Sequence, residues 1–107
     1  MAKYSVEIHP DAEAETDTLL LRGRELKVDL GRAICQIDDI AAAGVPDGLR
    51  SSATHDGYAL FRIYMGKVVV VFGIRRNRLV IACVKEYTTA YQADTALDQA
   101  KLRLASI

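Results

Sequence analysis

The sequence predicts a small α+β protein built on an antiparallel sheet, and three observations lead to this fold class. Residues 58–87 contain three apolar runs, each long enough for a strand, separated by two short breaks. β-Branched and aromatic residues dominate these runs, as is typical of strands. Breaks this short exclude parallel pairing, which needs a crossover of about a dozen residues. The flanking segments have helical periodicity, so helices are expected to cover the sheet.

The first half of the chain is predicted to form one strand and a helical region. Residues 3–8 alternate polar and apolar side chains, which is the period of a half-buried strand. A proline followed by several acidic residues favours a helix over residues 10–22. A second apolar stripe with helical spacing covers residues 26–41. Residues 10–43 therefore form either a helical hairpin or one long helix bent near Gly23.

The remaining segments complete the order β-α-α-β-β-β-α. Residues 49–54 have room for a short edge strand before the meander. Thr88 and Thr89 can cap a last helix over residues 90–104. The first strand cannot stay unpaired, so it is expected at the edge of the meander. We therefore predict a small antiparallel or mixed sheet with the helices, including an N-terminal helical hairpin, packed on one face.

Composition and charge narrow the class of protein. The 107 residues, half of them hydrophobic, suit a single domain over residues 1–107 with a core that needs no metal or disulfide. Cys35 and Cys83 are both expected to be small buried hydrophobes. Neither a signal peptide nor a membrane span is visible, so a soluble cytoplasmic protein is the default. Residues 1–48 carry ten acids and five Lys or Arg, whereas residues 49–107 carry four acids and nine Lys or Arg. This split indicates either an ordinary mixed surface or a basic half for a phosphate-bearing partner.

The candidate site consists of basic and aromatic residues, because the chain has no phosphate loop, metal-ligand spacing or GxSxG motif. Neither a cofactor nor a metal is expected. Arg62 interrupts an apolar strand, so its guanidinium must reach water, a carboxylate or a bound phosphate. Lys85 and Tyr87 share one face of their strand. Tyr87 can stack on a base, lend a hydroxyl to proton transfer or only close the core edge.

The register of the sheet decides whether Arg62 and Lys85 can act together. With hairpin loops of two or four residues, Arg62 pairs near Val71 and Ala82, and Lys85 falls on the opposite face. An odd loop or a β-bulge reverses this placement. The sequence leaves both arrangements open.

The order and spacing of these parts resemble the RelE/ParE superfamily of bacterial type II toxin-antitoxin toxins, closest to the HigB-like branch. The resemblance covers about residues 4–104 and is carried by four segments: YSVEIHPDAEAE, LFRI, VVVVFG and LVIACVKEYTTAYQADTALDQAKLRL. It implies a compact α/β toxin that cuts mRNA on the ribosome. Its partners would be a cognate antitoxin protein and mRNA, with no membrane, and homodimerisation stays open. ParE-like members instead poison DNA gyrase.

The resemblance also implies roles for individual residues. In metal-independent cleavage the ribose 2′-OH attacks the adjacent phosphate, which requires a base, a cation and an acid. Arg62 would stabilise the developing charge, and Lys85 and Tyr87 would serve the proton steps. The expected RNA-binding residues are Tyr64, Lys67, Arg75, Arg76, Arg78, Thr88, Lys101 and Arg103.

Three departures from the family pattern keep a second function open. Members usually carry an arginine in the middle strand, where this chain has Val68 to Val71, and Glu86 replaces the second lysine of the C-terminal turn. The net charge is zero, although ribosome binding favours basic proteins. The alternative is a non-nuclease member, either a gyrase-inhibiting toxin or an inactive binding scaffold.

Overall fold

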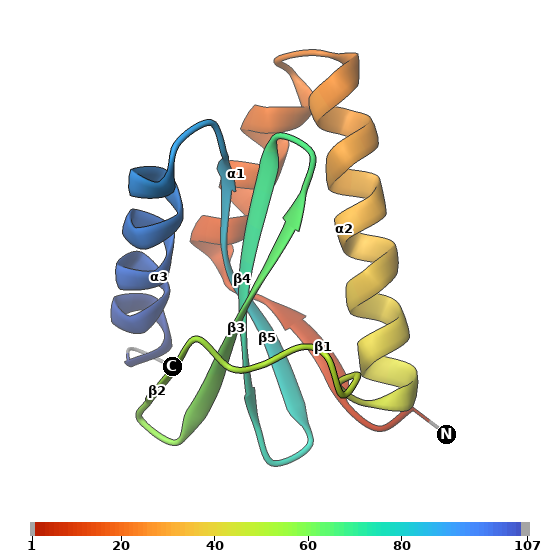
Figure 1. Cartoon of the computed structure of the whole chain (residues 1–107), viewed down its shortest axis with the longest axis vertical. Coiled ribbons are helices and arrows are strands. Elements are labelled where there is room, and N and C mark those ends of the chain that lie inside the picture. Colours follow the sequence, from red (N-terminus) through yellow and green to blue (C-terminus); the bar gives the residue numbers. More distant parts are fainter. Residues whose placement is uncertain (1, 106–107) are drawn as a thin grey trace.

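The meander forms the centre of the sheet in the computed structural model of the chain (Figure 1). Its strands are β3 (Tyr58–Met65), β4 (Val68–Arg75) and β5 (Arg78–Glu86). They pair in antiparallel fashion through two two-residue turns, as the short breaks predicted. The structure describes residues 2–105, without the side chains of residues 90 and 91.

Two edge strands extend the meander to a five-stranded mixed sheet of order β1-β5-β4-β3-β2. β2 (Ala53–His55) pairs antiparallel with β3, and β1 (Ser5–Ile8) pairs in parallel with β5. Of the two sheet types that the sequence left open, antiparallel and mixed, the structure has the mixed one. The helical region returns the chain to the end of the sheet where β1 begins, because the backbone N–H of Tyr4 donates to the Ala41 carbonyl. β3 and β5 consequently start from the same end as β1.

Three helices cover the sheet on both faces, whereas one face was expected (Figure 1). α1 (Pro10–Leu20) and α2 (Arg24–Ala43) form the hairpin alternative and pack on one face. α3 (Ala90–Ala105) packs on the opposite face. The physical reason is that residues 68–73 of β4 are buried on both sides, so each face needs a covering layer. Among residues 2–105, none of the helices combines the length and apolar composition needed to cross a membrane.

Gly66 makes the turn between β3 and β4 possible. Its φ of +58° lies in the left-handed region, and an added Cβ would stand 2.2 Å from Oδ2 of Asp29. That carboxylate oxygen accepts a hydrogen bond from the backbone N–H of Lys67 at 2.9 Å. The turn and the start of α2 are therefore packed against each other.

We expect Gly66→Ala to lower the free energy of unfolding by about 2 kcal/mol. The loss combines left-handed strain with the displaced Asp29 hydrogen bond. Urea denaturation measures it, and Gly48→Ala is the control because open space surrounds its Cβ position. Equal effects of the two substitutions would contradict this account of the turn.

Candidate functional site

A β-bulge in β5 decides the register question. Val71 of β4 pairs with Cys83, but the next residue, Phe72, pairs with Ile81. Ala82 is thus the extra residue of β5, and the inward and outward alternation of β5 shifts by one at this point. The bulge reverses the placement that even loops alone would produce.

As a consequence, the candidate catalytic residues lie on one face, the face that carries α3. Arg62 pairs with Val71, and Tyr64 pairs with Val69, whose partner on the other side is Lys85. Tyr87 follows two residues after Lys85 and shares its side of the strand. The structure therefore brings Arg62, Lys85 and Tyr87 to the same face.

Arg62 makes weak, solvated contacts there. Its Nε donates to Ser52 Oγ at 3.1 Å, and its Nη1 lies 3.4 Å from Oδ1 of Asp94 on α3. The Asp94 side chain is 76% exposed, and an ion pair this open contributes about 0–1 kcal/mol. A bound phosphate can therefore replace Asp94 at low cost.

Tyr64 and Tyr87 form an aromatic pair beside Arg62. Their ring centroids are 4.9 Å apart in an edge-to-face arrangement, and the Arg62 guanidinium carbon lies 5.9 Å from the Tyr64 ring centroid. Tyr64 is exposed and Tyr87 is half-buried. We call Arg62, Tyr64 and Tyr87 the aromatic platform, because accessible aromatic surface next to a cation suits base stacking and phosphate binding.

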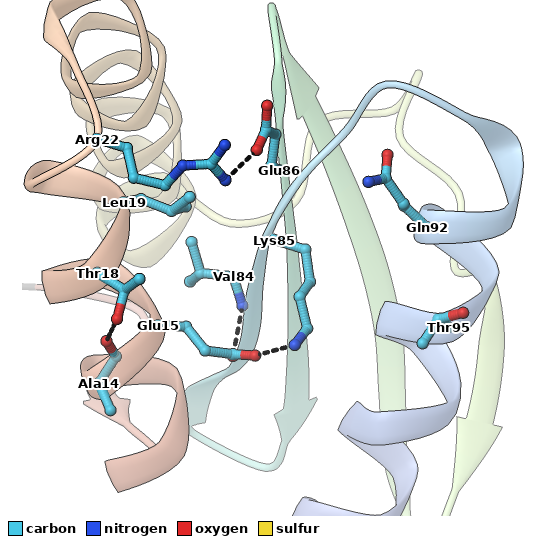
Figure 2. Close-up of a pocket in the computed structure, with 10 residues that line it drawn as sticks. All are labelled: Ala14, Glu15, Thr18, Leu19, Arg22, Val84, Lys85, Glu86, Gln92 and Thr95. Atoms are coloured by element: carbon cyan, nitrogen blue, oxygen red, sulfur yellow. Dashed lines mark hydrogen bonds and ion pairs between the residues drawn. The ribbon is translucent and has the colours of Figure 1, made fainter.

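Lys85 is paired with Glu15 of α1, a residue that the sequence reasoning missed. The Lys85 Nζ lies 2.5 Å from Glu15 Oε2, and Arg103 binds the same carboxylate at 2.5 and 3.2 Å. Glu15 also accepts the backbone N–H of Val84 at 3.1 Å (Figure 2). Burial alone would raise the pKa of Glu15, but these hydrogen bonds outweigh burial and lower it.

The sequence does contain a signal for Glu15. It stands three residues after Ala12 and four before Leu19, which are the two buried residues of α1. Residues at this spacing share one face of a helix. An acid on the buried face of a helix needs a cationic partner, so Glu15 was recognisable as an ion-pair residue without its partner being known.

A groove of about 470 Å³ surrounds the Glu15–Lys85 pair, between α1, β5 and α3 (Figure 2). Glu86, the acid that replaces a family lysine, is paired with Arg22 at the rim of this groove. The remaining lining residues come from all three elements and are Ala14, Thr18, Leu19, Val84, Gln92 and Thr95. The groove thus contains charges of both signs and is not a basic cleft.

Three of the predicted RNA contacts lie at the other end of the sheet. Arg75, Arg76 and Arg78 belong to the β4–β5 turn and its flanks. From Arg78 to Lys85 the strand rises about 23 Å. Arg78 is bound to Glu7 at 2.6 Å, and Arg75 lies over the ring of buried Tyr58 at 4.5 Å. The structure therefore does not bring these arginines to the aromatic platform.

Three of the other four predicted contacts, Lys67, Thr88 and Arg103, have side-chain partners. The Lys67 Nζ lies 2.9 Å from Glu25 on α2, and the Thr88 hydroxyl donates to the Gln92 side chain at 2.9 Å. The same Gln92 oxygen accepts the Thr89 backbone N–H, which caps α3. Lys101 is half-buried on α3. Of this group only Arg103 reaches the groove, through Glu15.

The two cysteines differ, although both were expected to be buried. Cys83 is buried, and this burial together with the nearby Glu15 carboxylate raises the pKa of its thiol to about 12. Cys35 is exposed on α2, so that prediction is wrong. The apolar stripe of α2 runs through Ala33 and Ile37, which places Cys35 on the solvent side.

Iodoacetamide is therefore expected to modify Cys35 but not Cys83 in the native protein at neutral pH, because only a thiolate reacts. Mass spectrometry of tryptic peptides measures both sites, and unfolding in urea should make Cys83 reactive. In Cys35→Ser, native labelling should disappear. Native labelling of Cys83 at a rate similar to Cys35 would show that β5 opens easily.

The site has two parts, the aromatic platform and the groove where Glu15 holds Lys85. Both lie toward the end of the sheet at the β3–β4 turn, because Tyr64 and Lys85 both pair with Val69. Figure 2 shows the groove between α1 and α3. Cations and aromatic rings in this arrangement can bind a phosphate and a base. Comparison with family models, curated proteins and solved structures finds no match to this chain, so its function has to be inferred from these residues.

Proposed function

We propose that the chain is a RelE/ParE-type toxin that binds mRNA on the ribosome and cleaves it without a metal ion. The observation that supports this proposal is the bulge at Ala82. It places Lys85 and Tyr87 on the same face as Arg62 and Tyr64. Without this extra residue, the two strands would present the candidate groups to opposite sides of the sheet.

The chemistry assigns one role to each group. The 2′-oxygen of a ribose attacks the adjacent phosphorus, the bond to the 5′-oxygen breaks, and a 2′,3′-cyclic phosphate and a 5′-hydroxyl result. Arg62 stabilises the negative charge on the phosphate oxygens. Lys85 and Tyr87 serve the proton transfers, one from the 2′-hydroxyl and one to the leaving 5′-oxygen. Tyr64 stacks on a base and keeps the RNA strand aligned with these groups.

Expression in a bacterial host tests this proposal. The chain is produced with and without the neighbouring reading frame, and the 5′ ends of cellular mRNA are mapped. We expect growth arrest and new cuts within translated codons when the chain is produced alone. Arg62→Ala should lack the cuts, and co-expression of an antitoxin from the neighbouring frame should prevent them. Cuts that persist in Arg62→Ala would remove Arg62 from the mechanism.

A second candidate function is a non-nuclease binding protein, such as a gyrase-inhibiting toxin or an inactive scaffold. The observation that favours it is that Arg62, Lys85 and Arg103 each contact a carboxylate. The charge of the site is thereby largely balanced, as is the charge of the whole chain. Growth arrest without mRNA cuts, together with inhibited DNA supercoiling, would support this candidate over the nuclease.

A further inference from the structure

Beyond the end of β1, side chains instead of a neighbouring strand bind backbone groups at the edge of β5. The last residue of β1, Ile8, pairs with Ile81, but β5 continues to Glu86. Beyond this point Glu15 accepts the Val84 N–H at 3.1 Å, and Arg103 donates to the Ala82 carbonyl at 3.0 Å. These are backbone groups that a neighbouring strand would otherwise bind. Glu15 and Arg103 therefore have a structural role that does not require Lys85.

The same carboxylate also controls the position of the Lys85 ammonium group. Figure 2 shows the Lys85 side chain extending along β5 toward Glu15, on the side of the groove. The Glu15 side chain is 15% exposed, whereas the Lys85 side chain is 33% exposed. If Lys85 leaves, Glu15 keeps Arg103 and Val84 as partners. Release of Lys85 therefore breaks one ion pair and leaves the buried part of the cluster intact.

We propose that Glu15 is an inhibitory positioning residue. It holds the Lys85 ammonium in the groove until an RNA phosphate replaces Glu15 as the partner of Lys85. This inference rests on the proposed RNA-binding function. The lysine side chain has a flexible four-carbon stem, so it can turn from the groove to the platform without movement of the backbone. Glu15 thus stabilises the edge of β5 and at the same time weakens RNA binding.

Glu15→Gln tests the inference, with Glu13→Gln as its matched control. Both substitutions remove one negative charge from α1, but Glu13 is exposed and distant from Lys85 along the helix surface. The affinity for a fluorescent single-stranded RNA is measured by anisotropy at several salt concentrations. We expect Glu15→Gln to bind about five- to tenfold more tightly than Glu13→Gln. Its plot of log affinity against log salt should be steeper by about 0.7, the value for one additional cation bound to single-stranded RNA.

A further substitution identifies the freed cation. Adding Lys85→Met to Glu15→Gln should remove both the gain in affinity and the steeper salt dependence. A role of Glu15 in folding alone would leave the salt dependence unchanged. If Glu15→Gln does not fold by circular dichroism, Glu15→Asp takes its place, because its shorter carboxylate withdraws from Lys85 while the charge remains.

The outcomes separate this inference from the proposed function. Wild-type RNA binding that is weakened by Arg62→Ala, with equal affinities for Glu15→Gln and Glu13→Gln, would overturn the inhibitory role and leave the proposed function standing. If neither the wild type nor Glu15→Gln bound RNA, this inference would be overturned, and the mRNA cuts mapped in the bacterial host would decide the proposed function separately. A gain that survived Lys85→Met would also overturn the inference, since the cation involved would not be Lys85.

Discussion

Arg62→Ala is expected to reduce the rate of mRNA cleavage by about 10²–10³-fold. The substitution removes the guanidinium that stabilises charge on the phosphate in the transition state, and loss of one such donor typically has this effect. The rate is measured as first-order loss of a defined mRNA in a reconstituted translation reaction with excess toxin. Stability should change by less than about 1 kcal/mol, because the contact between Arg62 and Asp94 is solvated.

Two controls make this result specific. Arg32→Ala removes an equal charge from an exposed position on α2 and should leave the cleavage rate within about twofold. Arg62→Lys keeps the charge but loses the planar fork of donors, so an intermediate rate is expected. If Arg62→Ala and Arg32→Ala had the same rate as the wild type, Arg62 would have no catalytic role and the non-nuclease candidate would gain support.

Glu15→Gln is expected to lower the free energy of unfolding by about 2–3 kcal/mol at neutral pH. The substitution removes the close ion pair between Glu15 and the mostly buried Arg103, whose contact to Asp11 is longer at 3.8 Å, and it weakens the contact to Val84. Urea denaturation of the wild type and the variant measures the difference. Glu13→Gln, on the exposed side of α1, should differ from the wild type by less than about 0.5 kcal/mol.

The sign of the pH dependence follows from the lowered pKa of Glu15. A carboxyl whose pKa is lower in the folded state binds its proton more readily when unfolded. Its contribution to stability is therefore complete above its unfolded pKa of about 4.3 and is lost as the pH falls through the folded value. The difference between the wild type and Glu15→Gln should thus be constant from about pH 6 to 8 and shrink below about pH 4. A difference that stayed constant to pH 3 would show that the Glu15 charge does not contribute.

Local patterns were sufficient for most elements of the fold. The β-branched runs and short breaks of residues 58–87 allow only hairpins, and the acidic start and apolar stripes of residues 10–43 allow only helices. These features depend on neighbours within a few residues along the chain. The break between α1 and α2 was also visible, because Gly23 interrupts the pattern at the place where the hairpin turns.

The candidate site was predictable only in part. Arg62 was recognisable because a charge inside an apolar strand requires a partner. Glu15 satisfies the same criterion on a helix, since it lies on the buried face of α1. Neither residue reveals its partner, because Asp94 is 32 positions from Arg62, and Lys85 is 70 positions from Glu15. Such pairs depend on how distant elements pack.

The sequence by itself determined which segments are strands and helices, and which residues carry charge into apolar surroundings. Only the tertiary structure decided that β1 pairs in parallel, that α3 covers the opposite face, and that Ala82 bulges out of β5. The physical reason is that side chains alternate with a period of two along a strand, so one extra residue reverses every later side chain. Whether a strand accommodates such a residue depends on the layers packed against it. In this chain the bulge at Ala82 brings Lys85 to the face of Arg62 and within reach of Glu15.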